Sequence, residues 1–201
     1  MSLAFYDLSN DLIREILCNY LEPIDVHSCL LTSKIFHVLL DIQLYNIIKK
    51  KTRGFVWGNC ILSGSLLTCQ KIYLLSNQLK LPINTHYDNE TTFRYCCRQG
   101  FLELAKWLYE LGIQQNLPIN IHAIDDYAFK QSCMNGRLKV AKWLFELSIQ
   151  LKSPINIYKC HELRHIMEEE CLERYMGSDR FNEYNETIDW LHKLSFIIHI
   201  Y

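Results

Sequence analysis

The sequence has almost no excess charge of either sign. Its 201 residues include 21 Lys and Arg and 22 Asp and Glu, which give a formal net charge of −1. A nucleic-acid partner would require a positive field to hold its phosphate backbone, so we expect none. No apolar run is long enough to span a bilayer, and residues 1–12 lack the basic flank and apolar stretch of a secretory signal. We therefore expect no membrane partner and a location in the cytosol or nucleus.

Cysteine motifs are also missing, although the chain contains nine cysteines. Their number is odd and no Cys-x-x-Cys occurs, which argues against a disulfide scaffold. Cys97 and Cys133 stand 36 residues apart, at equivalent positions of the repeat described next. We expect reduced thiols that serve as small core side chains.

Proline is scarce, and its placement reveals a repeat. Three of the four prolines stand in the tripeptide Pro-Ile-Asn, at residues 82–84, 118–120 and 154–156, so the spacing is 36 residues. The same spacing aligns three glycines, Gly64, Gly100 and Gly136. A fixed period of 20–50 residues is typical of stacked structural repeats.

Each repeat predicts two helices. The first helix, over residues 91–98 and again 127–134, ends at Gly100 or Gly136, because glycine adopts a left-handed C-cap at little cost. The second helix carries apolar residues at i, i+3, i+4 and i+7, which form one continuous stripe. These residues are Leu104, Trp107, Leu108 and Leu111, and then Val140, Trp143, Leu144 and Leu147. A polar stretch and Pro-Ile-Asn follow, where the proline forbids further helix.

The repeats are expected to stack, because one helix pair cannot bury its apolar face alone. Their predicted ranges are about 53–88, 89–124, 125–160 and 161–201. The first repeat is degenerate, with Lys71 at the position of Trp107, as is usual for an end unit. In the fourth repeat Trp190 matches Trp143 at a spacing of 47 residues. We place the 11 additional residues within 168–182, as a loop or a lengthened helix.

The repeats resemble the ankyrin repeat family. The stretches GFLELAKWLYELGI (100–113) and GRLKVAKWLFELSI (136–149) look like the family's second helix, and the resemblance extends over residues 53–200. Two departures concern the loops: the family's Thr-Pro-Leu-His opening is weakened at residues 91–94 and 127–130, and the period exceeds the usual 33. The resemblance implies a protein-binding solenoid. Trp-bearing repeats of this kind are typical of large DNA viruses, which implies a place in an infected host cell.

The tryptophans allow two interpretations. Their helical spacing already explains Trp107 and Trp143 as core residues between repeats, and this is the interpretation that we favour. The alternative is an aromatic groove that binds a partner.

Residues 1–50 lack the repeat markers and predict a separate module of three short helices. Ser9 or Asn10 can cap the first helix, and the chain breaks at Pro23. Asp25 can cap the second, and the third extends to Tyr45. So short a segment with many large apolar side chains leaves a hydrophobic surface to cover.

This module resembles the F-box, on the stretch LSNDLIREILCNYLEPIDVHSCLLTSKIFHVL (8–39). It departs from the family pattern in two places: Ser9 replaces a proline, and one residue is added near Asn19. The resemblance implies binding to the Skp adaptor protein of SCF-type ubiquitin ligases, and through it to a cullin. The residues that would make this contact are Leu8, Leu12, Ile16, Leu17, Leu21, Pro23 and Phe36. The alternative is that the apolar residues of the module simply cover the first repeat.

One motif would suit an enzyme. His161, Glu162 and His165 form His-Glu-x-x-His, which on a helix presents two zinc ligands and a general base. Against a zinc hydrolase, Arg164 places a cation inside the motif, and no third ligand stands at a familiar spacing. No phosphate-binding glycine loop or nucleophile motif occurs either. We expect neither catalytic activity nor a cofactor or metal.

Together these patterns predict an all-α protein with an F-box-like module at 1–50 and ankyrin-like repeats at 51–201. Its expected function is that of a substrate-receptor adaptor of an SCF-type ubiquitin ligase. The target is an unknown protein, bound by the inter-repeat loops at 85–90 and 121–126. The residues expected to bind it are Asp88, Asn89, Glu90, Asp125 and Asp126. The main alternative is a scaffold or sequestering factor that binds a partner without any ubiquitin ligase.

Overall fold

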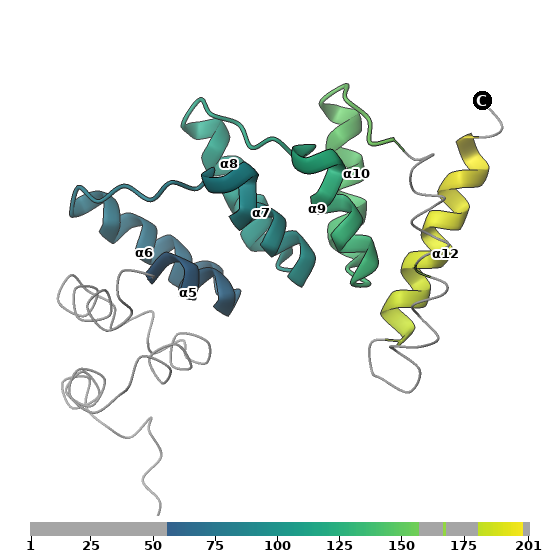
Figure 1. The fold of residues 1–201 in the computed structure, drawn as a ribbon, viewed down its shortest axis with the longest axis horizontal. Coiled ribbons are helices and arrows are strands. Elements are labelled where there is room, and N and C mark those ends of the chain that lie inside the picture. Colours follow the sequence, from purple (N-terminus) through teal and green to yellow (C-terminus); the bar gives the residue numbers. More distant parts are fainter. Residues whose placement is uncertain (1–55, 157–166, 168–180, 199–201) are drawn as a thin grey trace, which may run out of the picture. The chain divides into compact units, whose positions relative to one another are not determined.

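The structure, a computed structural model, describes residues 56–156, 167 and 181–198. Over these residues every regular element is an α-helix and no strand is present, so the predicted all-α class is confirmed there (Figure 1). The helices are α5 (Val56–Ser63), α6 (Leu66–Gln78), α7 (Tyr87–Gln99), α8 (Leu102–Gln114), α9 (Ala123–Met134), α10 (Leu138–Gln150) and α12 (Phe181–Ile198). The predicted module at residues 1–50 lies outside the described residues.

The chain divides into two compact units, Met1–Asn84 and Thr85–Tyr201. Helices α5 and α6 belong to the first unit, and α7 to α10 together with α12 belong to the second. The boundary between the two units thus lies directly after the Pro-Ile-Asn at residues 82–84. The boundary predicted at residue 50 lies outside the described residues and stays a prediction.

The 36-residue period is visible in the helix bounds. Helices α6, α8 and α10 begin at Leu66, Leu102 and Leu138, and they end at Gln78, Gln114 and Gln150. The first helices of the next two pairs, α7 and α9, begin at Tyr87 and Ala123. The three predicted repeats from 53 to 160 therefore each contain a pair of helices within the described residues.

The glycines end the first helices in the predicted way. Gly100 and Gly136 have φ values of 84° and 66°, in the left-handed region that glycine adopts without a Cβ penalty. The amide of Phe101 donates to the carbonyl oxygen of Cys96 at 2.9 Å, and that of Arg137 donates to Ser132 at 2.7 Å. These bonds satisfy the carbonyl groups that the helix end leaves open.

The predicted apolar stripe of the second helices is buried. Leu104, Leu108 and Leu111 of α8 lie in the core, as do Val140, Leu144 and Leu147 of α10. Trp107 and Trp143 are half-buried at the edge of this stripe. The Pro-Ile-Asn segments contribute Ile119 and Ile155, both buried. Packing of these side chains holds each pair together.

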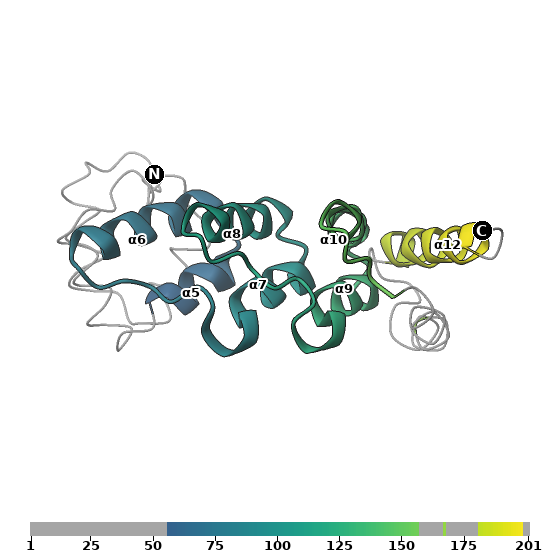
Figure 2. The ribbon, with the colours of Figure 1, turned by 90° about the horizontal axis from the view of Figure 1, so that it is seen from above.

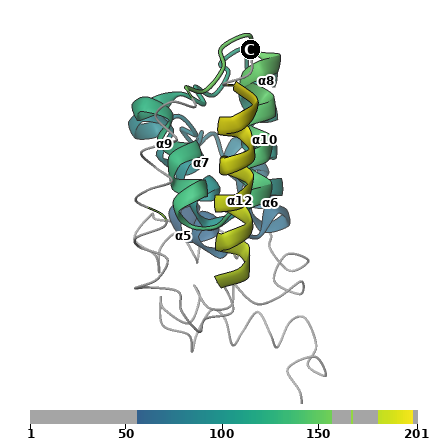
Figure 3. The same cartoon turned by 90° about the vertical axis from the view of Figure 1, so that its right-hand side faces the viewer.

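The second unit has two rows of helices. Seen from above, α8, α10 and α12 form one row, and α7 and α9 form the other (Figure 2). The first helices α7 and α9 make the most extensive contact, and α12 packs on both α9 and α10. From the α12 end, the axes of α8, α10 and α12 run in similar directions (Figure 3). Helix α12 therefore follows α10 in the row of second helices. The segment predicted to form the first helix of this repeat lies outside the described residues.

Helix α12 contains both the predicted repeat residues and part of the insertion. Thr187 and Leu191 are buried, as are the matching Val140 and Leu144 of α10. The equivalent of Leu138, the first residue of α10, is Asn185, but α12 already begins at Phe181. Residues 181–182 of the predicted insertion are therefore helical, but residues 168–180 lie outside the described part of the chain, so the choice between a loop and a lengthened helix stays a prediction.

Candidate protein-binding site

Helices α7 and α9 each begin with a left-handed turn. Residues 88–90 have φ values of 48°, 50° and 64°, and residues 124–126 have values of 55°, 54° and 59°. The right-handed helix starts directly after each turn, at the predicted residues 91 and 127. None of these six residues is glycine, and L-residues disfavour the left-handed helix by roughly 1–2 kcal/mol each. Specific contacts must therefore stabilise both turns.

A histidine bridges each turn to a buried carboxylate. Nδ1 of His86 donates to Oε1 of Glu90 at 3.0 Å, and Nδ1 of His122 donates to Oδ1 of Asp126 at 2.5 Å. Glu90 and Asp126 are only 7% and 9% exposed. A carboxylate so placed needs hydrogen-bond partners, and the histidine four residues earlier supplies one.

Glu90 also contacts the connection to the next repeat. Its Oε1 accepts a hydrogen bond from the backbone amide of Asn120 at 3.3 Å. Asn120 belongs to the Pro-Ile-Asn that ends the same repeat and precedes the turn of the next. The carboxylate therefore joins its own turn to the segment that leads into the following one.

Basic side chains complete the turns. Arg94 donates to the carbonyl oxygens of Asn89 at 2.8 Å and Asp88 at 3.0 Å. Its guanidinium also lies over the ring of Tyr127 in α9, 5.1 Å from the ring centroid. At the position equivalent to Arg94, Lys130 donates to Oδ2 of Asp125 at 2.6 Å. Cationic groups thus offset the acidic charge of both turns.

The outer residues of the turns are accessible. Asp88, Asn89 and Asp125 are exposed, in contrast to Glu90 and Asp126. Among the residues predicted to bind a target, the first three can therefore reach a partner directly. The other two hold the turns in shape. Their binding role stays a prediction.

Two apolar side chains at the turns were not predicted as binding residues. Tyr87 is 69% exposed and Ile124 is 51% exposed. Ile124 occupies the position of Asp88 one repeat later and has a φ value of 55°. A β-branched residue in this region is a strong outlier, and such residues cluster at ligand-binding sites. Only the structure reveals the outlier, because a lone isoleucine carries no such signal in the sequence.

The described tryptophan contacts support the core interpretation. The ring of Trp143 lies 6.1 Å from that of Phe93 and 6.3 Å from that of Tyr109, both in the preceding repeat. Trp190 makes the equivalent contacts with Phe129 and Phe145, at 6.3 and 6.0 Å. Both tryptophans therefore pack between repeats, at the ring separations that favour aromatic pairs.

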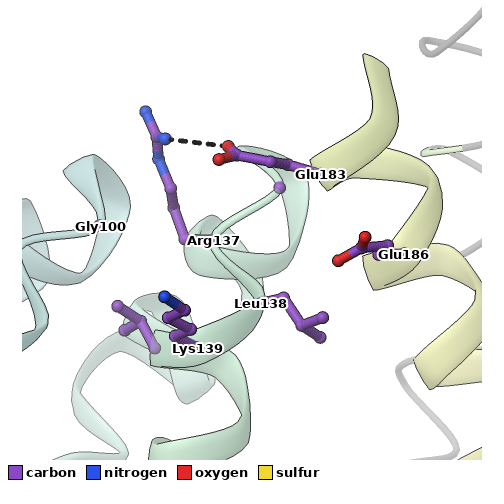
Figure 4. Close-up of a pocket in the computed structure, with 8 residues that line it drawn as sticks. Gly100, Arg137, Leu138, Lys139, Glu183 and Glu186 are labelled. Atoms are coloured by element: carbon purple, nitrogen blue, oxygen red, sulfur yellow. Dashed lines mark ion pairs between the residues drawn. The ribbon is translucent and has the colours of Figure 1, made fainter. Parts of the chain in front are cut away.

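A pocket of about 230 Å³ lies where α12 meets the α9–α10 connection (Figure 4). Glu183 and Glu186 project into it from α12, and Arg137 and Lys139 line the opposite side. The guanidinium of Arg137 and the carboxylate of Glu183 form an ion pair at 3.7 Å. The charged lining groups are two cations and two carboxylates, and one of each already forms an ion pair. The pocket therefore has no charge preference for an anionic or a cationic ligand.

The described cysteines are reduced and buried, as predicted. These are Cys60, Cys69, Cys96, Cys97 and Cys133. Burial raises the pKa of the Cys97 thiol far above its ordinary value, because a thiolate there would lose its hydration. This thiol stays protonated and inert at neutral pH.

Several predicted sites lie outside the described residues. They include the zinc motif at His161, Glu162 and His165, and all residues predicted to contact the Skp adaptor. Within 56–156, 167 and 181–198, no three His, Cys, Asp or Glu side chains are grouped as metal ligands require. None of the helices described there has the length and apolar character needed to cross a bilayer.

Comparisons of this chain with protein-family models, curated proteins and solved structures found no match.

Proposed function

We propose that this protein is a substrate-receptor adaptor of an SCF-type cullin-RING ubiquitin ligase. Its residues 1–50 would bind the Skp adaptor protein, as their F-box-like pattern implies, and its ankyrin-like helix pairs would bind a target protein. Other subunits would carry out the transfer of ubiquitin. The target is held close to the ligase because one chain carries both binding sites.

The observation that supports target binding is the exposed, strained Ile124. Folding gains nothing from an apolar side chain held in water, and the left-handed backbone at this position adds a cost. The equivalent residue of the preceding repeat is Asp88, which the left-handed region tolerates better. Strained residues of this kind cluster at binding sites, so we infer that a partner covers Ile124.

The turn is also rigid enough to serve as a binding surface. The hydrogen bonds of His122 with Asp126 and of Lys130 with Asp125 restrain the turn on both sides of Ile124. A preorganised loop loses less conformational entropy on binding than a flexible one. The proposed target therefore meets a surface that is already in its binding shape.

Substitution of Ile124 separates the effect of this residue on stability from its effect on target binding. We expect Ile124→Asn to raise the free energy of unfolding by about 0.5–1 kcal/mol, because asparagine tolerates the left-handed region. The same change should weaken target binding, because it removes the apolar contact. Thermal denaturation and quantitative co-purification measure the two quantities in parallel.

The matched control is Ile149→Asn. Ile149 is 53% exposed, close to the value for Ile124, but it lies in the regular helix α10. This control should bind the target as the wild type does and should not gain stability. If Ile124→Asn destabilises the protein while every bound protein is retained, the proposed target site is wrong.

The role of the N-terminal module is tested separately with the tagged, full-length chain. Wild type and Ile124→Asn should both recover the Skp adaptor and a cullin from cells, whereas Leu12→Asp combined with Ile16→Asp should recover neither. The double variant should still recover the target. Failure of the wild type to recover the Skp adaptor would favour the alternative, a repeat protein that sequesters its partner without a ligase.

A further inference from the structure

Two thiols meet inside the first unit. Sγ of Cys60 in α5 lies 3.1 Å from Sγ of Cys69 in α6, and both residues are fully buried. Only Gly64 and Ser65 connect the two helices. Neither sulfur is part of a disulfide. The pair therefore sits across a tight helical hairpin in its reduced form.

Packing of the repeat does not require both thiols. Cys60 is equivalent to Cys96 and Ser132 in the next two repeats, while Cys69 is equivalent to Ala105 and Ala141. All of these residues are buried, including both alanines at 0% exposure. The position of Cys69 thus accepts a methyl group in two repeats of the same fold. The second thiol is an addition that only the first of these three repeats has.

We propose that Cys60 and Cys69 are a site of reversible oxidation, at which a peroxide converts the two thiols into one disulfide. One sulfur, as its thiolate, attacks the peroxide, becomes a sulfenic acid and releases water. The other thiol then attacks that sulfur, forms the S–S bond and releases a second water. In total the peroxide accepts two electrons and the two thiol protons, and it leaves as two molecules of water. A dithiol reductant reverses the reaction by exchange.

The geometry requires little movement. A disulfide is about 2.05 Å long, so the sulfurs must approach by about 1 Å from their present 3.1 Å. Each cysteine lies on a helix, and the helices already pack together. By contrast, Cys96 belongs to a repeat in which the equivalent of Cys69 is Ala105, so that repeat lacks the second thiol at this place.

Access to oxidant comes from local opening of α5. Gly58 and Leu62 on the surface of this helix are exposed. Native proteins open locally at individual elements without unfolding as a whole, which gives a small oxidant access to buried groups. Once formed, the disulfide joins α5 to α6 and opposes further opening, because it constrains the separated state.

The test uses the full-length chain under native conditions. The protein is treated with a small excess of hydrogen peroxide, free thiols are alkylated, and the peptides are analysed by mass spectrometry without reduction. We expect a cross-linked peptide containing Cys60 and Cys69, lighter by two hydrogens and lost after dithiothreitol. Hydrogen exchange of the α5 amides should slow several-fold in the oxidised protein.

Two variants replace a cysteine with the residue found at the equivalent position of another repeat. Cys69→Ala introduces the alanine that the next two repeats have, and it should abolish the cross-link and the slower exchange. Cys96→Ser takes the residue at Ser132 and should leave both unchanged. The proposal is overturned if Cys60 and Cys69 of the wild type remain alkylatable, oxidise without a link, or link mainly to other cysteines. The readout is covalent, so it does not depend on the proposed ligase role.

Discussion

The second unit contains two junctions between successive repeats, and they differ in the chain that connects them. The regular junction joins α7 and α8 to α9 and α10, at a spacing of 36 residues. The lengthened junction joins α9 and α10 to α12, where the spacing is 47 residues. Both use a tryptophan of the later repeat against two aromatic rings of the earlier one. The tryptophan contact is therefore the same at both junctions, although the second has eleven additional residues in its connection.

Both junctions also bring a residue of the later repeat against a capping glycine. A Cβ on Gly100 would lie 2.7 Å from Cδ of Arg137, and one on Gly136 would lie 3.2 Å from Cα of Tyr184. The regular junction thus places a flexible side chain at this point, whereas the lengthened junction places backbone there. The packing faces of the helices therefore determine how the repeats stack, and the length of the connecting chain does not.

Trp143→Ala should have the largest effect. Removing its ring leaves a cavity between Phe93 and Tyr109, and we expect a loss of about 3–5 kcal/mol in the free energy of unfolding. Trp190→Ala removes the equivalent ring contacts with Phe129 and Phe145 at the lengthened junction, so we expect a comparable loss. Chemical denaturation of both variants measures the two losses. Clearly unequal losses would contradict the view that the two junctions depend on the same contact.

Gly136→Ala should have the next largest effect on stability. The positive φ costs an alanine about 1–2 kcal/mol, and the backbone of Tyr184 has little room to yield. Gly100→Ala has the same backbone cost, but the Arg137 side chain can move away. We therefore expect Gly136→Ala to lower the melting temperature more than Gly100→Ala. The reverse order would mean that the Arg137 contact is the tighter one.

Glu90→Ala tests the hydrogen bonds that the turn adds at the regular junction. It removes the acceptor for both His86 and the amide of Asn120, and we expect a loss of about 1–3 kcal/mol. Glu103→Ala is the control, because Glu103 is exposed and pairs only with Lys106 at 3.3 Å among the described contacts. Its effect should stay below about 0.5 kcal/mol. Similar losses in denaturation experiments would contradict a structural role for Glu90.

Glu183→Ala should have the smallest effect. Its ion pair with Arg137 is specific to the lengthened junction, but its side chain is 61% exposed and the distance is 3.7 Å. Solvent screens such pairs, so we expect a loss below about 0.5 kcal/mol. Measurements at low and high salt should agree closely. A larger, salt-sensitive loss would show that the ion pair fixes α12 in place.

The sequence predicted the helices of the repeats because their signals are local and periodic. The stripe of Leu104 and Leu108 predicts a buried helix face, and Gly100 predicts a helix end. The alignment of α12 with α10 was also predictable, because Trp190 matches Trp143 despite the insertion. In each case one side-chain property determines the structure.

The left-handed turns could not be predicted in this way. Residues 88–90 and 124–126 contain no glycine, and Ile124 by itself disfavours the conformation. Several contacts act together there, and one of them joins Glu90 to Asn120 thirty residues away. The recurrence of a histidine four residues before an acid, at His86 and His122, was the available signal. Its meaning depends on geometry that spacing alone does not supply.

The adaptor function is tested most directly by a calorimetric titration of the purified full-length chain with purified Skp adaptor protein. We predict saturable one-to-one binding by the wild type and by Ile124→Asn, and loss of binding by Leu12→Asp combined with Ile16→Asp. These results would show that residues 1–50 recruit the ligase independently of the repeat turns. No heat of binding with the folded wild type, or unchanged binding by the double variant, would contradict the adaptor function.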